Sequence, residues 1–175
     1  MKFQGVAQPG EITPSQTVGP FFRVCLATDA EHGRLLPEET PRIALAIRVL
    51  DGAGAPVDDA LVEIWQPDGS GGSYAFGRLA TGEDGSCEFE TIQPPVPSSG
   101  AAHVSVCVFA RGLLHHVLTR VYFDGDERLG QDPVLALVPE HRRATLVAHR
   151  DAAAPGRWIF DIHLQGEQET VFFDA

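Results

Sequence analysis

From Ile43 onward the chain is a series of short apolar segments, each ended by residues typical of turns. This pattern limits the possible folds more than any other feature of the sequence. The first segment, 43–50, ends at an Asp-Gly pair, and the second, 60–66, ends at Pro-Asp-Gly. Such residues interrupt strands because glycine accepts left-handed backbone angles and proline has no backbone N–H to donate. A chain that turns this often has little room for long helices.

Strand-like patterns recur along the rest of the chain. In 86–92, Cys87, Phe89 and Thr91 alternate with two glutamates, and a strand with one buried face shows this period of two. We expect strands over 43–50, 60–66, 86–92, 103–110, 114–123 and 158–164, with 171–173 at a sheet edge. The one expected helix is short and covers 139–143, with its proline in the first turn.

The fold class that follows is all-β, a single-domain β-sandwich with very little helix. The 18 glycines and 13 prolines support it, because they supply many turns. Residues 1–40 show little periodicity, so we expect an extended N-terminal arm there, with a short helical turn near 26–32. The arm would belong to the same domain as the sandwich core, 41–175.

Charge and cysteine content exclude several classes of partner and location. The net charge is −11 and no run of lysine or arginine reverses it, so we expect no binding to nucleic acid or to anionic membranes. A small anionic substrate would be repelled as well, unless a single arginine held it. The three cysteines form no CxxC pair, and no segment resembles a signal peptide or a membrane span. We therefore expect a cytoplasmic protein with reduced thiols.

The residue types by themselves reveal no catalytic centre. There is no GxSxG motif, and the glycine-rich stretch 69–73 is followed by no lysine, which favours a flexible loop over a phosphate-binding one. His115 and His116 would point to opposite faces of a strand. His103 shares its face with Ser105, which is a poor ligand for a transition metal. We interpret His103 as a partly buried strand residue that is hydrogen-bonded within the fold.

Several segments, taken in order, carry a family resemblance. They are TPSQTVGPF (13–21), EIWQ (63–66), HVSVCVFARG (103–112), TRVYF (119–123), FDIHLQGE (160–167) and ETVFFD (169–174). In these segments the whole chain resembles the intradiol ring-cleaving dioxygenases. The ARG tripeptide together with the closing QGEQETVFFD resembles the alpha branch of that family.

The resemblance implies an intradiol-type β-sandwich and an oxidoreductase of aromatic-compound catabolism, in the β-ketoadipate pathway. In the family, a catalytic beta subunit holds non-haem Fe(III) with two tyrosinates and two histidines, and O2 opens the ring of a catechol such as protocatechuate. Here the second histidine position is Ser105, one tyrosine position is Val96, and an arginine position falls near Gly100. His103 remains, and Tyr74, which we interpret as a loop aromatic, lies close to the other tyrosine position. We therefore expect no metal site and no catalytic residue in this chain, and Fe(III) in a partner beta subunit.

The resemblance further implies that this chain forms one wall of an active site at the interface with the beta subunit. The substrate-binding residues carried over are Thr17, Gly19, Pro20 and Arg111. Gly19 lets the backbone approach a flat ring, and Pro20 holds that backbone rigid. Arg111 offers a planar, permanently charged fork for a carboxylate. Without the resemblance, Gly19-Pro20 is a simple turn and Arg111 a surface residue of a β-turn.

Two other functions stay open on the sequence. The chain could be a self-sufficient intradiol enzyme with rearranged ligands, which would carry iron and turn over without a partner. It could also be a non-enzymatic β-sandwich module that binds a ligand or another protein, because this architecture hosts many unrelated functions.

Overall fold

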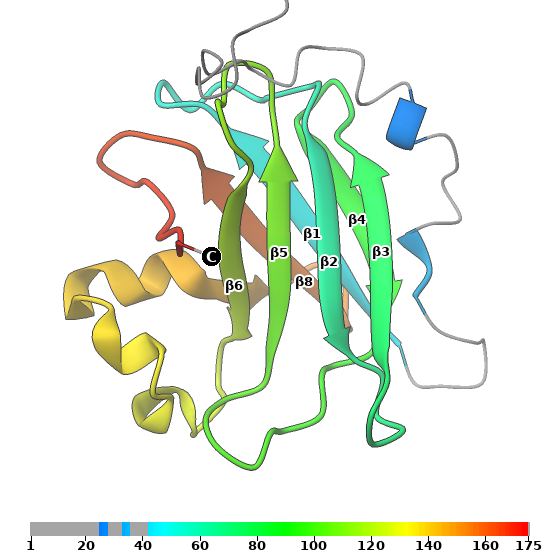
Figure 1. Ribbon diagram of the computed structural model, residues 1–175, viewed down its shortest axis with the longest axis vertical. Helices are drawn as coiled ribbons and strands as arrows, with labels where there is room; N and C mark the ends of the chain where they lie inside the picture. The colour runs from blue at the N-terminus through cyan, green and yellow to red at the C-terminus, as the bar shows by residue number, and fades with distance from the viewer. Residues whose placement is uncertain (1–24, 28–32, 36–41, 175) are drawn as a thin grey trace, which may run out of the picture.

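The computed structural model of the protein describes residues 25–27, 33–35 and 42–174 (Figure 1). Thr17, Gly19 and Pro20 lie outside these residues, as does most of the expected arm. Of the helical turn expected near 26–32, the start is described and is helical at Leu26. The strands are β1 Ile43–Leu50, β2 Leu61–Pro67, β3 Tyr74–Ala80, β4 Ser86–Thr91, β5 His103–Phe109, β6 Val117–Phe123, β7 Val147–Arg150 and β8 Arg157–His163.

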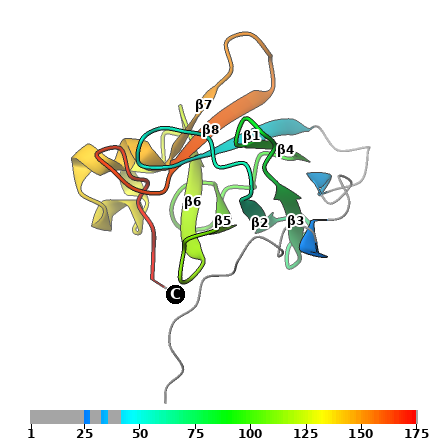
Figure 2. The ribbon, with the colours of Figure 1, turned by 90° about the horizontal axis from the view of Figure 1, so that it is seen from above.

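The strands form an eight-stranded sheet with the order β3-β2-β5-β6-β7-β8-β1-β4, which folds over on itself. In Figure 1 the layer β3-β2-β5-β6 lies in front of β8, β1 and β4, and Figure 2 shows the two layers from above. The short strand β7 joins them, because it pairs in parallel with β6 and antiparallel with β8. The predicted β-sandwich is confirmed.

The core lies between the two layers and follows the predicted alternation. On β8, Trp158, Phe160 and Ile162 are buried, while the residues between them face outward. On β4, Cys87 and Phe89 point into the same core. Burying each large apolar side chain contributes about 1.5–3 kcal/mol, so this interdigitated layer is what holds the sandwich together.

The predicted start of strand β6 needs correction. β6 begins at Val117 and not at 114, so His115 and His116 lie in the turn before the strand. The argument that adjacent strand residues point to opposite faces therefore does not apply to that pair. Their environment is a turn, in which the ring of His116 lies 5.3 Å from that of Phe109.

Strand β3 was not predicted, and its burial pattern explains why. It buries the small residues Ala75 and Gly77 and exposes Tyr74 and Phe76, so its hydrophobic alternation is the reverse of the usual one. The interpretation of Tyr74 as a loop aromatic is wrong, because Tyr74 begins this strand. Strand β7 was also not predicted, because four residues are too few to show a period.

Between Arg42 and Asp174, helical structure is confined to short 3-10 segments that follow β6. They are η2 Leu129–Gln131, η3 Leu135–Leu137 and η4 Glu140–Leu146. The predicted helix over 139–143 corresponds to η4, with Pro139 at its N-cap. These segments cover a second, smaller apolar cluster that includes Tyr122, Val138 and Leu146.

The cysteines are free thiols. Burial raises the pKa of Cys87 and of Cys107 to about 12, so both remain protonated and pack as small apolar side chains. Cys107 is therefore part of the packed strand β5. Among the described residues, no helix has the length and apolar character needed to cross a bilayer.

Candidate functional site

Strand β5 lies in the middle of the front layer and carries the two positions where the family resemblance leads us to look for histidines. His103 and Ser105 are two residues apart and therefore face the same side of the sheet. Ser105 is opposite Trp65 of β2 on one side and Arg120 of β6 on the other. The side chains at these four positions determine what the outer face of this layer can bind.

His103 is held within the fold. Its Nδ1 lies 3.1 Å from the carbonyl oxygen of Ala101, and since a carbonyl only accepts, the ring nitrogen donates. Its ring lies 5.5 Å from that of Tyr122. Burial lowers the pKa of His103 below its ordinary value, and the charge of Arg120 adds to this. The interpretation as a partly buried, hydrogen-bonded strand histidine is confirmed.

Tyr122 is a structural residue. It is fully buried, and its hydroxyl donates to Oδ1 of Asp132 at 3.0 Å. Burial raises the pKa of Tyr122 to about 12, so the phenolate that a ferric ion requires is disfavoured near neutral pH.

Asp132 connects the segment before β5 to the helical segments after β6. It accepts hydrogen bonds from the backbone N–H groups of Leu135 at 2.8 Å and Ala101 at 3.0 Å. Burial by itself would raise the pKa of Asp132, but these hydrogen bonds outweigh it and hold the pKa below its ordinary value. Gly100 has a φ of 91°, and a Cβ there would strike the Asp132 carboxylate. An arginine at position 100 would therefore not fit this fold.

The residues present do not fit a ferric ion. Tyr74 is 71% exposed at the start of β3, and Val96, at the other tyrosine position, has no ligating atom. Ser105 offers a neutral hydroxyl, which binds transition metals weakly. In the part of the chain that the structure describes, no three His, Cys, Asp or Glu side chains are arranged to hold a metal ion.

The EIWQ segment supports the fold. Glu63 is buried and pairs with Arg78 of the neighbouring strand β3, with Arg78 Nε 2.6 Å from Glu63 Oε1. Gln66 is also buried and accepts a hydrogen bond from Thr91 at the end of β4 at 2.9 Å, which ties the front layer to the rear one. Trp65 lies on the outer face, with its ring 5.0 Å from that of Phe76.

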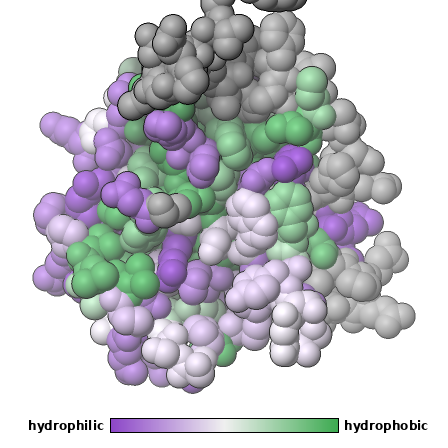
Figure 3. Space-filling view, viewed as in Figure 1, coloured by the Kyte–Doolittle hydropathy of each residue, from purple (hydrophilic) through white to green (hydrophobic). Residues whose placement is uncertain are grey.

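A cavity of about 350 Å³ opens on this outer face, next to the family's ligand positions. Its lining includes Trp65, Ser105, Arg120 and Asp174, so it combines an aromatic ring with both signs of charge. Figure 3 shows this side of the molecule, where hydrophilic and hydrophobic side chains interleave.

Arg111 lies where the sequence predicted it, in the turn between β5 and β6. The turn is closed by Leu113 N–H donating to the Ala110 carbonyl at 3.2 Å, and Gly112 has the positive φ, 95°, that the turn requires. The Arg111 side chain is 65% exposed, and its Nε lies 3.2 Å from Oδ2 of Asp59. Sequence reasoning missed Asp59, because no local pattern links it to a turn so distant along the chain.

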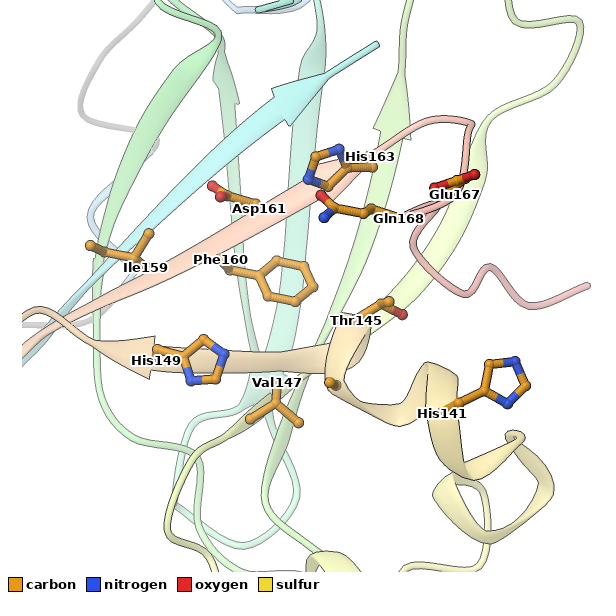
Figure 4. A pocket seen from close by; sticks show the side chains of 11 residues that line it. His141, Thr145, Val147, His149, Ile159, Phe160, Asp161, His163, Glu167 and Gln168 are labelled. Carbon is orange, nitrogen blue, oxygen red and sulfur yellow. The ribbon is translucent and has the colours of Figure 1, made fainter. Parts of the chain in front are cut away.

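Another cavity, of about 570 Å³, lies elsewhere, beside η4, β7 and β8. His141, His149 and His163 line it, with Asp161 and Glu167. Figure 4 shows the three imidazoles spread around the cavity, so they do not converge on one point. Asp161 is already held by Arg48, with two contacts of 3.0 and 2.7 Å. Arg111, which is the inferred substrate-binding position that the structure describes, does not line this cavity.

Comparison with known proteins places the chain among relatives of similar length. It is 43% identical to the protocatechuate 3,4-dioxygenase alpha chain of Burkholderia cepacia, over 93% of this chain and 97% of that one. The Pseudomonas putida alpha chain is 37% identical over 93% and 96%, and the Burkholderia cepacia beta chain 28% over 89% and 77%. No family model matches.

A solved structure of a dioxygenase shares the fold. The dioxygenase domain of a dioxygenase–carbohydrate-binding fusion protein from Streptomyces sp. SirexAA-E superimposes with a TM-score of 0.63. It is 28% identical, and the match covers 89% of this chain and 99% of that one. The fold and the strand positions thus define the class, which is that of the intradiol dioxygenases.

Within that class, the chain belongs to the family of protocatechuate 3,4-dioxygenase alpha chains. The family consists of oxidoreductases, as the resemblance in the sequence implied.

Proposed function

We propose that this chain is the alpha subunit of a hetero-oligomeric protocatechuate 3,4-dioxygenase and forms one wall of the active site. The beta subunit would carry the non-haem Fe(III), and with O2 the enzyme would convert protocatechuate to 3-carboxy-cis,cis-muconate. The observation that carries the proposal is the 43% identity to an alpha chain over 93% of this chain. The more distant match to a beta chain supports a related but separate partner.

Assignment of the iron to the partner is supported by the side chains at the family's ligand positions. Ser105 and Val96 cannot replace an imidazole and a phenolate, and His103 is packed against Tyr122. A ferric site needs several strong, correctly oriented ligands, and one half-buried histidine does not supply them. The oxygen chemistry would therefore belong to the beta subunit.

The contribution of this chain would be to shape the pocket and to attract its substrate. We propose that Thr17, Gly19 and Pro20 line the pocket and that Arg111 binds the substrate's carboxylate. The exposure of the Arg111 guanidinium supports this role, because a partner or a substrate can reach it. On a chain with a net charge of −11, a local cation also offsets the long-range repulsion of an anion.

Co-expression with a candidate beta subunit tests the proposal. We expect the purified complex to contain iron and to open the ring of protocatechuate, and the purified alpha chain to do neither. Metal analysis and oxygen uptake would be measured on the complex, on each subunit alone and on a remixed sample. Stoichiometric iron with ring opening in the alpha chain alone would contradict the proposal and favour a self-sufficient enzyme. A complex that forms but shows no ring opening would favour a non-enzymatic module.

A further inference from the structure

We infer that Asp59 is a positioning residue for Arg111, fixing the direction in which the guanidinium is presented to an anionic substrate. The inference rests on the substrate-binding role proposed above for Arg111. It adds a second side chain, from a different part of the sequence, that makes that role specific for a carboxylate.

The contact between the two side chains is unusual in its burial. Arg111 is largely exposed, whereas the Asp59 side chain is only 15% exposed. Its Oδ2 is buried and accepts no hydrogen bond, although Arg111 Nε lies 3.2 Å away. A buried carboxylate oxygen without a hydrogen bond is costly. The Arg111 guanidinium is the cation beside that oxygen. If the guanidinium moved away, the buried Asp59 carboxylate would lose this compensating charge.

The backbone around Asp59 is held in place by a buried threonine. Thr81 is fully buried, its hydroxyl donates to the Val57 carbonyl at 2.7 Å, and it accepts from the Ala60 N–H at 3.0 Å. These bonds bracket Asp59 on both sides. The carboxylate is thus a fixed reference point and not a mobile surface group.

The other end of the contact is equally well defined. Ala110 is buried, and the Ala110–Leu113 turn is closed by a hydrogen bond, so the Arg111 backbone has little freedom. Asp59 approaches at Nε, and among the described residues Arg111 makes no other ion pair. The Nη1 and Nη2 groups, which form the outer edge of the planar fork, therefore remain for a second carboxylate.

Asp59 can affect substrate binding by Arg111 in two ways, one that strengthens it and one that weakens it. As an anchor, it reduces the orientations that Arg111 must give up on binding, which strengthens the hold on a substrate carboxylate. As a nearby negative charge, it weakens the same hold by partly neutralising the guanidinium. The rigid backbone on both sides favours the anchoring effect, since a neutralising charge would not need to be held in place.

The test uses the assembled alpha–beta enzyme and measures one ratio, kcat/KM for protocatechuate divided by kcat/KM for an uncharged catechol. We expect Asp59→Ala to lower this ratio roughly fivefold, the equivalent of a coupling of about 1 kcal/mol. Asp59→Asn, which keeps the shape and an acceptor oxygen, should retain most of the ratio. In an Arg111→Ala background, Asp59→Ala should cause no further change. Glu83→Gln, which removes one charge from the exposed turn after Thr81, serves as the matched control and should leave the ratio unaltered.

Each alternative outcome has a distinct meaning. If Asp59→Ala and Asp59→Asn both raise the ratio, Asp59 acts as a neutralising charge and the inference is wrong. If Arg111→Ala lowers the ratio but Asp59→Ala does not, Arg111 binds the substrate without an anchor, and again the inference alone fails. If Arg111→Ala leaves the ratio unchanged, the proposed role of Arg111 falls and the inference falls with it.

Discussion

At the scale of single residues, a few side chains determine the chemical properties of the outer face of β5. Ser105 presents a hydroxyl between Trp65 and Arg120, where an imidazole would be needed for a second histidine ligand. The Nδ1 atom of His103 is directed to the carbonyl oxygen of Ala101. Arg120 lies on this face and Arg111 in the turn that follows β5, and neither belongs to the apolar core between the layers.

Replacing Arg111 with alanine tests the substrate-binding role directly. In the assembled enzyme we expect KM for protocatechuate to rise about tenfold, because a charged hydrogen bond is worth about 1.5 kcal/mol or more. KM for an uncharged catechol should change little. Steady-state kinetics with both substrates measure the difference, and Arg128→Ala, another exposed arginine, provides a control. Equal losses for both substrates would show that Arg111 does not bind the carboxylate.

Removing the Tyr122 hydroxyl should destabilise the chain without disturbing its surface. Tyr122→Phe deletes the hydrogen bond to the buried Asp132, at a cost of about 1–2 kcal/mol. For a chain of this size we expect Tm to fall by roughly 2–6 °C. Tyr74→Phe is the matched control, since that hydroxyl belongs to an exposed side chain. Equal Tm values for the two variants would mean that the Tyr122–Asp132 contact contributes nothing.

At the scale of elements, turns and small residues determine where strands begin and how closely neighbouring segments approach. β3 packs through Ala75 and Gly77, so the strand was hidden from any search for apolar alternation. β1, β4, β5 and β8 were recognisable because each buries side chains at every second position along at least part of its length. Local sequence therefore predicts strands whose side chains fill the core, and it misses strands whose inward-facing side chains are small.

The turn before β5 offers a prediction of its own. Gly100 and Gly54 both have positive φ, 91° and 78°, but a Cβ at position 54 meets nothing, whereas at 100 it strikes Asp132. Either alanine substitution costs about 1 kcal/mol or more in backbone strain. Gly100→Ala should cost at least a further ~1 kcal/mol from the displaced carboxylate. Urea unfolding of the two variants measures the difference, and equal free energies of unfolding would show that Asp132 moves aside freely.

At the scale of the whole molecule, the sandwich is a nearly closed sheet on a strongly acidic chain. Ion pairs connect segments far apart in sequence, such as Arg48 with Asp161 and Arg157 with Glu88. Exposed pairs of this kind contribute about 1 kcal/mol or less each, so the core and not the charges dominates stability. Titrating groups contribute more to stability when they are buried, as Asp132 is, or half-buried, as His103 is.

Acid should therefore weaken the fold in two stages. The pKa of His103 is lowered in the folded chain, so its contribution is present above the unfolded value of about 6.5 and is lost as the pH falls through the lower folded pKa. The pKa of Asp132 is lowered too, and its contribution is lost in the same way below about pH 4. Urea midpoints at pH 7, 6, 5 and 3.5 would follow both stages.

A variant separates the two stages. His103→Gln should flatten the decline between pH 7 and pH 5 and leave the loss below about pH 4 in place, because the Asp132 hydrogen bonds are unaltered. An unchanged slope between pH 7 and pH 5 in this variant would show that His103 is not the group responsible.

The sequence by itself determined the all-β class, most of the core-filling strands and the family, because alternation, turn residues and motif positions are local properties. The tertiary structure decided the order of the strands, the bridging role of β7 and the pairing of Asp59 with Arg111. It also decided that a side chain at position 100 meets Asp132. These depend on which distant segments meet, and the chain's local preferences do not encode a contact between residues that are close only after the two layers have closed.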